Sequence, residues 1–383
     1  MMDFDALRRW PDVESPDLRA WDAADTLILD EAAALLGGDV TVIGDEYGAL
    51  TLGALDRGAA HVRVHTDELT GELALAANGS GAYEILPLDR RLVEAATVVL
   101  LRLPRSLDAL EKIAALLAAS ASPDVVVVAG GRLKHMTVSM NEVLLKHFGR
   151  LDITHARQKS RVLIAREPKP GPPAEPRRRQ HDGLWVVATG GVFAGTSIDI
   201  GTRALLSVLD RAPRFESAVD LGCGTGILAA HLARANPGAH VLASDRSAAA
   251  VESARLTMEA NGLPVRVTRD DALSAEAEAS ADLVVLNPPF HSGAAVHPGV
   301  STALFEGAAR VLRPGGELWS VWNSHLAYKP TLERIVGPTR QIARTPKFTV
   351  TASVRASQIF EGRDDLRASR QSARHERAQE KGS

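Results

Sequence analysis

The sequence predicts two α/β domains, each a β-sheet of βαβ units with helices on both faces. Three observations support this fold class. The chain has 383 residues, which is too long for one ordinary domain and suits two. Along both halves, apolar runs of strand length alternate with stretches of helix length, as in repeated βαβ units. Five prolines between Pro168 and Pro176 interrupt this pattern near the middle of the chain.

The composition is that of an ordinary globular protein. Hydrophobic residues make up 45% of the chain and charged residues 24%, which excludes a wholly disordered or collagenous chain. Cys223 is the only cysteine, so the chain has no disulfide framework and no multi-cysteine zinc site, and we expect a reducing compartment, the cytoplasm.

Nothing in the sequence indicates a membrane protein. No run of 18 apolar residues occurs, and the N-terminus has no apolar signal core, so we expect no membrane association. The net charge of −3 is unlike that of a non-specific nucleic-acid coat protein, but a local basic face can still bind RNA phosphates.

The N-terminal domain is predicted to span residues 1–166. Its strands are short apolar or alternating runs, and its helices have amphipathic periodicity. The predicted strands are residues 40–43, 61–65, 96–103, 124–129 and 161–165, and the predicted helices are residues 107–119 and 138–148. The rhythm is weaker than in the C-terminal half, and it suggests a second α/β sheet that arose by duplication.

Residues 167–182 form the predicted linker. Proline removes a backbone donor and fixes φ, so neither a helix nor a central strand can run through its five prolines. The arginines at 177–179 follow at once and are either solvated linker residues or contacts to an RNA backbone. At the far end of the chain, residues 356–383 are mostly charged and small, which predicts a frayed or disordered tail.

The C-terminal domain, residues 183–355, has the clearer alternation of strands and helices. The predicted strands are residues 217–221, 240–244, 265–268, 282–286, 317–322 and 348–354, and the predicted helices include residues 227–235, 248–261 and 301–312. This order is typical of a sheet with helices on both faces.

A glycine-rich turn follows the first of these strands. The strand runs through Asp220, and Gly222, Gly224 and Gly226 precede the next helix. Such glycines let the backbone turn tightly and let a ligand approach without a Cβ in the way, although many glycine turns are only tight connections. The spacing is not the usual dinucleotide fingerprint, and no Gly-Lys-Ser/Thr phosphate loop occurs. We interpret Cys223 as a small loop filler rather than a nucleophile.

Acidic residues end the next two strands. Asp245 lies about 20 residues beyond the turn, where a carboxylate can accept hydrogen bonds from a ribose diol. The structural alternative is that Asp245 caps the following helix. Asp270 and Asp271 end the third strand, and both are candidate partners for an adenine amino group. We favour Asp271.

The motif Asn287-Pro288-Pro289-Phe290 ends the fourth strand. The prolines fix an extended backbone, so the Asn287 side-chain oxygen and the Pro288 carbonyl can both accept from one exocyclic amine. Holding that amine aims its lone pair at a methyl sulfonium, which is largely a positioning effect. Phe290 offers a face on which an exposed or flipped-out base can stack, or it lies in the core at a proline-bounded strand end. His291 suits a structural or base-edge contact better than acid–base catalysis.

These residues resemble the ribosomal RNA guanine-N2 methyltransferase family, the small-subunit methyltransferase C and large-subunit methyltransferase G type. The turn resembles motif I of class I S-adenosylmethionine-dependent methyltransferases, and the likeness covers nearly all of residues 183–355. It includes Gly191 to Ala194, Asp199 to Leu206, Asn287 to Gly293, Ala309 to Trp319, Asn323 to Tyr328 and Lys347 to Val350. It implies two tandem Rossmann-like methyltransferase domains, the N-terminal one degenerate and the C-terminal one a seven-stranded doubly wound sheet.

The resemblance implies S-adenosylmethionine as the cofactor. The candidate cofactor residues are Asp199, Thr202, Asp220, Gly222, Cys223, Gly224, Gly226, Asp245, Asp271 and Asn287, and the candidate catalytic residues are Asn287, Pro288, Pro289 and Phe290. A helix N-cap is the plain alternative for Asp199. Asn323 and His325 either shape the substrate pocket or are ordinary loop residues. No His, Asp or Glu cluster has metal-ligand spacing, so no metal is assigned.

The N-terminal domain lacks both motifs. Asp45 and Glu46 replace the small residues of the cofactor turn, and its fourth strand ends in Leu101-Arg-Leu-Pro-Arg, without an Asn-Pro-Pro sequence. We therefore expect it to bind no cofactor, and the resemblance implies that it supports folding of its partner domain or contacts RNA. Candidate phosphate contacts are Arg102, Arg105, Arg132, Lys134 and Lys159, with solvated surface as the alternative.

The sequence therefore predicts an enzyme that methylates the N2 amine of a guanine in ribosomal RNA with S-adenosylmethionine. The expected partner is ribosomal RNA or a ribosomal subunit, and we expect a cytoplasmic monomer. Because the same acceptor geometry suits any planar amine, an N6-adenine or a protein-glutamine amide methyltransferase is the alternative within catalysis. The alternative from another class is a non-catalytic RNA-binding or ribosome-assembly protein with a vestigial cofactor fold.

Overall fold

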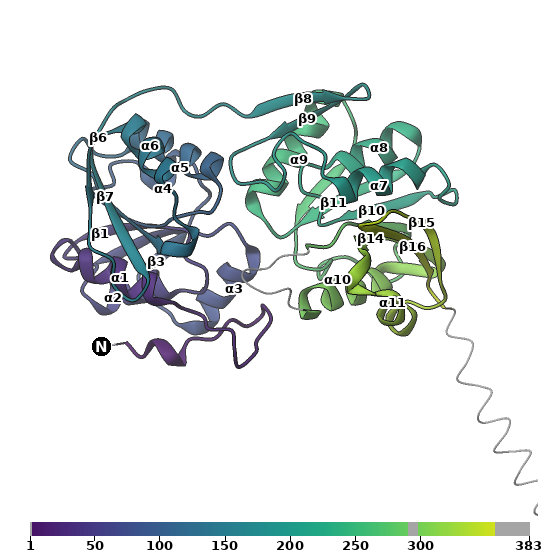
Figure 1. The fold of residues 1–383 in the computed structure, drawn as a ribbon, viewed down its shortest axis with the longest axis horizontal. Coiled ribbons are helices and arrows are strands. Elements are labelled where there is room, and N and C mark those ends of the chain that lie inside the picture. Colours follow the sequence, from purple (N-terminus) through teal and green to yellow (C-terminus); the bar gives the residue numbers. More distant parts are fainter. Residues whose placement is uncertain (1, 290–297, 357–383) are drawn as a thin grey trace, which may run out of the picture.

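Two α/β domains lie side by side in the structure, a computed structural model that describes residues 2–289 and 298–356 (Figure 1). Each domain is built on a seven-stranded sheet, with strand orders β3-β2-β1-β4-β5-β7-β6 and β12-β11-β10-β13-β14-β16-β15. In both sheets five neighbouring strands are parallel and the last two pairings are antiparallel. The shared order confirms the prediction of two tandem domains of one topology.

The N-terminal domain has two apolar core layers, one on each face of its sheet. Its strands are β1 (Asp39–Ile43), β2 (His61–His65), β3 (Tyr83–Ile85), β4 (Val98–Arg102), β5 (Val126–Arg132), β6 (Phe148–Ile153) and β7 (Ser160–Pro168). Its helices are α1 (Ala23–Glu31), α2 (Ala49–Asp56), α3 (Leu69–Asn78), α4 (Arg90–Val93), α5 (Leu107–Ser120) and α6 (Val138–His147). Apolar residues of α1, α2 and α3 fill one layer, and those of α4, α5 and α6 fill the other.

The C-terminal domain repeats this arrangement. Its strands are β10 (Ser217–Leu221), β11 (His240–Asp245), β12 (Arg266–Arg269), β13 (Ala281–Leu286), β14 (Leu312–Asn323), β15 (Thr339–Arg344) and β16 (Phe348–Val354). Its helices are α7 (Ile200–Leu209), α8 (Ile227–Ala235), α9 (Ala248–Asn261), α10 (Pro298–Val311) and α11 (Lys329–Ile335). Helices α7, α8 and α9 bury one face of the sheet, and α10 and α11 bury the other.

The connection between the domains is partly a strand, which differs from the predicted linker. Arg177–His181 forms β8, which pairs antiparallel with β9 (Leu184–Ala188) in a hairpin. Strand β7 also extends through Glu167 and Pro168, so before the hairpin only residues 169–176 of the predicted linker lack helix and strand. The hairpin lies beside the C-terminal domain (Figure 1), and its strand β9 packs against α9, where Val187 N donates to Thr257 Oγ1 at 3.0 Å.

The remaining differences are strands and helices that the sequence analysis did not name. The structure adds β3, β6 and β15 and helices α1 to α4, α7 and α11. Strand β15 reads Thr-Arg-Gln-Ile-Ala-Arg and lies at a sheet edge, so it carries little of the apolar signal that marks a buried strand. Among the described residues, no helix has the length and apolarity needed to cross a membrane. Most of the predicted tail, residues 357–383, lies outside the described residues.

Candidate active site

The three glycines after β10 have two different structural roles. Gly222 and Gly224 have φ of +67° and +53°, and no atom lies within 4 Å of the position that a Cβ would take. Gly226 begins α8 with φ of +77°, and its Cβ would lie 2.8 Å from Met258 Cε. The first two glycines therefore keep space open above the turn, whereas Gly226 lets α8 pack closely against α9.

Asp220 lies beneath the turn rather than in it. Its side chain is fully buried, and Oδ2 accepts a hydrogen bond from Ala229 N at 2.9 Å. Burial raises the pKa of Asp220 to about 7 because a carboxylate away from water loses its hydration. Asp220 therefore supports the start of α8 from below.

Asp245 ties the turn to the next helix. Its Oδ2 accepts from Gly224 N at 2.9 Å, and its Oδ1 accepts from Ser247 N at 3.0 Å. Burial raises the pKa of this carboxyl group. The capping alternative is wrong, because Ser247 is the N-cap of α9 and its Oγ accepts from Ala250 N. The Asp245 carboxylate instead lines the cavity described below.

Asp270 and Asp271 have different surroundings. Both oxygens of Asp270 are engaged within its own loop, by Ser274 Oγ at 2.6 Å and Ala275 N at 3.1 Å. Asp271 also lines the cavity, and its side chain has no hydrogen bond to another described residue. The geometry therefore leaves Asp271 as the carboxylate that can accept a bond from a ligand.

The Asn287 side chain is held by its nitrogen. Nδ2 donates to Thr202 Oγ1 at 2.9 Å and to the two oxygens of Asp199 at 3.3 and 3.2 Å. Asp199 is fixed as the N-cap of α7, where it accepts from Gly201 N and Thr202 N. Because three acceptors surround Nδ2, the amide can take only one orientation. Asn287 Oδ1 is buried and has no partner among the described residues.

These residues surround one cavity of about 380 Å³. The predicted residues that line it are Asp199, Thr202, Gly222, Cys223, Gly224, Asp245, Asp271, Asn287, Pro288 and Pro289. Asp220 and Gly226 do not line it, for the reasons given above, and neither do Asn323 and His325. Phe290 and His291 lie outside the described residues. A more open hollow of about 590 Å³ is lined by residues between 5 and 21 and contains none of the predicted site residues.

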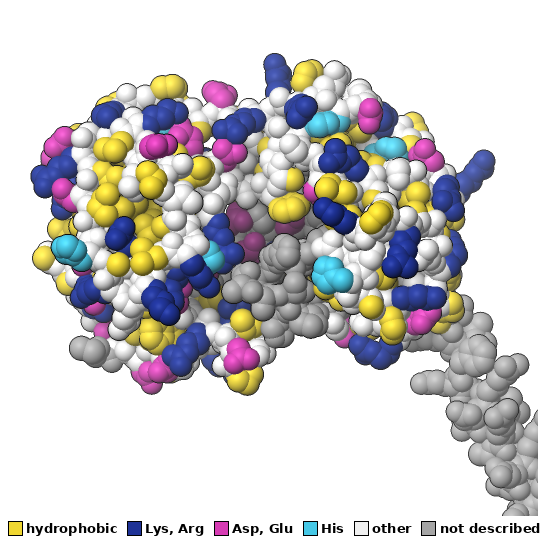
Figure 2. Space-filling model, viewed as in Figure 1, with side chains coloured by type: hydrophobic (Ala, Val, Ile, Leu, Met, Phe, Trp, Pro, Cys, Tyr) yellow, Lys and Arg dark blue, Asp and Glu magenta, His cyan; other side chains and the backbone are white. Residues whose placement is uncertain are grey.

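The cavity is closed on one side by the N-terminal domain, which sequence reasoning missed. Pro11, Asp12, Val13, Asp67 and Glu68 all line it, and Figure 2 shows the hollow where the two domains meet. These residues precede the glycine turn by more than 150 positions, so no local pattern connects them to it. Only the docking of the domains reveals their role.

Charge is distributed unevenly around the cavity. Seven carboxylates line it, namely Asp12, Asp67, Glu68, Asp199, Asp245, Asp270 and Asp271. Among the described lining residues Arg246 is the only lysine or arginine. Such a lining attracts a cationic ligand. In the described parts of the chain, no group of three or more His, Cys, Asp or Glu side chains is arranged to hold a metal ion.

Comparison with known proteins identifies the family. Ribosomal RNA large subunit methyltransferase G of Streptomyces avermitilis is 37% identical over 375 residues, which cover 91% of this chain and 97% of that protein. The protein of the same name from Shewanella amazonensis is 34% identical and covers 91% and 96%. The chain belongs to this methyltransferase G family.

Both domains match family models. The model for the methyltransferase small domain matches residues 183–352, and the model for the RLMG N-terminal domain matches residues 3–169. A solved structure described as T. thermophilus 16S rRNA N2 G1207 methyltransferase (RsmC) in complex with AdoMet and guanosine has a TM-score of 0.71. It is 24% identical and covers 90% of this chain and 97% of that protein, so the two-domain fold is shared over almost the whole length.

In this methyltransferase G family member, the turn of the N-terminal domain that corresponds to the glycine turn is filled by one of its own side chains. Asp45 is buried and accepts from Gly48 N at 3.0 Å and from Thr51 N at 2.8 Å. Its side chain therefore caps its own helix and takes up the backbone donors of the turn. This is the physical consequence of an acid at a position where the C-terminal domain has small residues.

The strand end at Asn287-Pro288-Pro289 is here called the Asn-Pro-Pro corner. The corresponding strand end in the N-terminal domain holds a cluster of ion pairs. Arg102 ends β4 and pairs with Asp22 at 2.9 Å, with Glu46 at 3.3 Å and with Asp25. Burial raises the pKa of Asp25 to about 6. Arg102 is therefore engaged within its own domain, which argues against the predicted phosphate contact at this position.

Proposed function

We propose that this protein transfers the methyl group of S-adenosylmethionine to the exocyclic N2 amine of a guanine in ribosomal RNA. The observation that carries the proposal is the single orientation of the amide of Asn287, a residue that lines the cavity beside the glycine turn and whose buried oxygen has no partner among the described residues. A carbonyl oxygen in this place can accept a hydrogen bond from an amine.

The cavity fits the cofactor. The space above Gly222 and Gly224 lets an adenosyl group approach the backbone closely. We assign Asp245 to the ribose hydroxyls and Asp271 to the adenine amine, since carboxylates accept from both kinds of donor. The acidic lining suits a ligand with net positive charge. When bound, S-adenosylmethionine supplies an electrophilic methyl group on a sulfonium.

The residues of the Asn-Pro-Pro corner orient the amine. Asn287 Oδ1 and the Pro288 carbonyl accept its two hydrogens, while Asp199 and Thr202 keep the Asn287 amide from turning. The amine lone pair would then face the methyl group that bound S-adenosylmethionine would supply, with S-adenosylhomocysteine as the leaving group and water as the acceptor of the amine proton. Positioning supplies most of the rate gain, because no group must first remove a proton.

The relatives support the substrate class. Two of them are named ribosomal RNA large subunit methyltransferases, and the structural neighbour is named as a guanine-N2 methyltransferase of 16S rRNA. The choice of guanine N2 rests on that likeness and on a corner that suits a planar amine.

Exposed basic residues offer a surface for the RNA backbone. Arg105, Lys134 and Lys159 are exposed at loops near the carboxyl ends of β4 and β5. Leu133 N donates to the Lys159 carbonyl at 2.9 Å, and Arg105 Nη2 lies 3.3 Å from His135 Nε2, so these loops adjoin one another. Strand β8 adds three exposed arginines, 177–179. We propose that both regions contact phosphates.

The test is transfer of an isotope-labelled methyl group to ribosomal RNA and to ribosomal subunits, followed by nucleoside analysis. We expect N2-methylguanosine with the wild-type protein and at least a 100-fold slower reaction with Asn287→Ala, while both proteins bind S-adenosylmethionine. N6-methyladenosine or methylglutamine as the product would contradict the guanine assignment. A wild-type protein that binds no S-adenosylmethionine by calorimetry would favour a ribosome-assembly role.

A further inference from the structure

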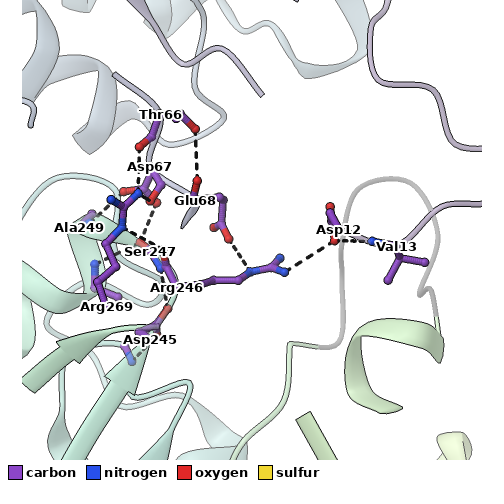
Figure 3. A network of polar contacts seen from close by, with 12 residues as sticks. Asp12, Val13, Thr66, Asp67, Glu68, Asp245, Arg246, Ser247, Ala249 and Arg269 are labelled. Carbon is purple, nitrogen blue, oxygen red and sulfur yellow. Dashed lines mark hydrogen bonds and ion pairs between the residues drawn. The ribbon is translucent and has the colours of Figure 1, made fainter. Parts of the chain in front are cut away.

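Arg246 bridges the two domains at the edge of the cavity. It follows Asp245 at the end of β11, and its side chain extends between two carboxylates of the N-terminal domain (Figure 3). Its Nε lies 2.5 Å from Glu68 Oε2, and its Nη1 lies 3.7 Å from Asp12 Oδ1. All three side chains line the cavity.

Asp12 is itself fixed by the degenerate turn of the N-terminal domain. Its Oδ2 accepts from Tyr47 Oη at 2.7 Å and from Arg9 Nη2 at 2.9 Å, and the Arg9 guanidinium lies over the Tyr47 ring. The turn that carries acids in place of small residues thus holds a carboxylate against the cavity of the other domain.

The segments after β2 and β11 also pair with each other. Leu69 N donates to the Arg246 carbonyl at 2.9 Å, and Ala248 N donates to the Asp67 carbonyl at 2.8 Å. Leu69 and Ala248 are the first residues of α3 and α9, so the contact has approximate two-fold symmetry, as between two copies of one domain.

The Asp67 side chain completes this contact. It accepts from Ser247 Oγ at 2.6 Å and from Ala249 N at 2.8 Å, and so caps α9 from the other domain (Figure 3). The loop that presents Asp245 to the cavity is therefore held by the N-terminal domain through backbone and side-chain bonds together.

Arg246 directly follows Asp245, which we assign to the ribose hydroxyls of the cofactor. Arg246, Asp12 and Asp271 all line this cavity. A planar guanidinium can stack on a purine, and one that is already paired keeps its orientation. An unpaired guanidinium here would repel a cofactor that carries a sulfonium.

We propose that Glu68 and Asp12 make the N-terminal domain part of the cofactor site, because they position Arg246 for the adenosyl group and neutralise its charge towards the cationic cofactor. This inference rests on the proposed function. It assigns to the domain without a cofactor turn a part in cofactor binding, and it makes Glu68 and Asp12 positioning residues that act through Arg246.

The test compares two ligands that differ in charge. S-adenosylmethionine has a net positive charge at pH 7, and S-adenosylhomocysteine is neutral overall. With Glu68→Gln, and to a smaller degree with Asp12→Asn, we expect the Kd of S-adenosylmethionine to rise about five- to twenty-fold and that of S-adenosylhomocysteine to rise only about two-fold. Arg246→Gln leaves its carboxylate partners unpaired. We therefore expect the Kd of S-adenosylmethionine divided by that of S-adenosylhomocysteine to fall in this variant, whereas it rises in Glu68→Gln.

The matched control is Glu252→Gln. Glu252 on α9 also pairs across the domains, with Lys112 at 2.6 Å, but neither residue lines the cavity. We expect both Kd values of this variant to stay within about two-fold of wild type. Equal weakening of both ligands in Glu68→Gln, or the same weakening in Glu252→Gln, would overturn the proposal in favour of a general loss of domain docking.

Hydrogen exchange gives a second readout in the unmodified protein. If the cofactor binds to both domains, it must stabilise their contact by the same coupling. We expect S-adenosylmethionine to slow exchange of the Leu69 amide, which bonds across the interface without lining the cavity. Unchanged exchange at saturating cofactor would contradict the inference alone, whereas a wild-type protein that binds no cofactor would contradict the proposed function.

Discussion

At the scale of single residues, the hydrogen-bond partners of Asn287 decide which end of its amide can bind a ligand. An amide presents a donor group and an acceptor of nearly the same shape, and only hydrogen-bond partners decide which one faces a ligand. Asp199 accepts a hydrogen bond from Asn287 Nδ2 and so fixes the orientation of the amide, and it also caps α7. The helix-cap interpretation of Asp199 is confirmed. Its role in the cofactor site stays a prediction, although the residue lines the cavity.

Thr202→Val tests the orientation of Asn287. Valine keeps the shape of threonine but removes the oxygen that accepts from Asn287 Nδ2. We expect kcat for methyl transfer to fall about five-fold, which corresponds to one hydrogen bond of about 1 kcal/mol, with the KM for the cofactor nearly unchanged. The control is Ser207→Ala on the same helix, whose hydroxyl only bonds the Ala204 carbonyl. A Thr202→Val enzyme with wild-type kcat would contradict the orienting role.

Asp220 predicts a pH dependence of stability. Its pKa is raised to about 7 in the folded protein, whereas an unfolded aspartate titrates near 4. The folded state therefore holds the proton more tightly, and this contribution, complete below about pH 4, is lost as the pH rises towards 7. We expect Asp220→Asn to be more stable than wild type by about 4 kcal/mol at pH 8 and nearly equal to it at pH 4.

Denaturant unfolding of the two proteins at both pH values, without cofactor, measures this difference. Asparagine keeps an oxygen that can accept from Ala229 N, so the comparison isolates the charge. If the gap between the two proteins is the same at pH 4 and pH 8, the carboxyl group does not titrate in this range.

At the scale of elements, the glycine turn combines a binding surface with a packing contact. Its first two glycines face open space, and its third lies against α9. The sequence presents the three glycines as one motif, because spacing alone does not say which neighbour each residue meets. In the structure, the three glycines differ in the atoms that a Cβ at each position would contact.

Gly222→Ala and Gly226→Ala should therefore fail in different ways. Both alanines would adopt a left-handed φ, which costs about 1 to 2 kcal/mol. The methyl group of an alanine at position 226 would also press on Met258 and Ala254. We expect Gly226→Ala to lose about 2 to 4 kcal/mol of stability in urea unfolding. Gly222→Ala should lose less stability but bind S-adenosylmethionine at least ten-fold more weakly. Equal losses of stability would contradict the packing argument.

At the scale of the whole molecule, two domains of the same strand order have different roles. Both sheets have the same strand order, yet in the N-terminal one Asp45 fills the turn and Arg102 fills the corner with ion pairs. The domain keeps its shape, docks its β2 end on the β11 end of its partner, and adds acidic residues to the cavity. Its exposed basic loops are the surface that we propose for RNA.

Replacing the basic loop residues tests RNA contact by the N-terminal domain. Arg105, Lys134 and Lys159, changed together to glutamine, should weaken binding of ribosomal RNA and lower the slope of log K against log salt by about one unit for each lost phosphate contact. Cofactor affinity should stay at the wild-type value. The control is Arg90→Gln with Arg91→Gln on α4, whose charges pair with Glu94 and Asp89. The same salt slope in the triple variant and in wild type would exclude these phosphate contacts.

The sequence by itself determined the two-domain fold and the strands that carry the motifs. β10, β16, α8 and α9 have the predicted bounds, because buried strands and capped amphipathic helices leave local signals. The turn, Asp245 and the Asn-Pro-Pro corner were found in the same way, since each follows directly on a strand.

Only the tertiary structure decided how these pieces work together. It joined Asp12, Asp67 and Glu68 to a cavity built mainly by the other domain, turned part of the linker into β8, and gave the Asn287 amide its orientation. The physical reason is that such contacts join residues far apart in the chain. Their energy depends on distances that exist only after the domains have docked, so no local pattern of residues records them.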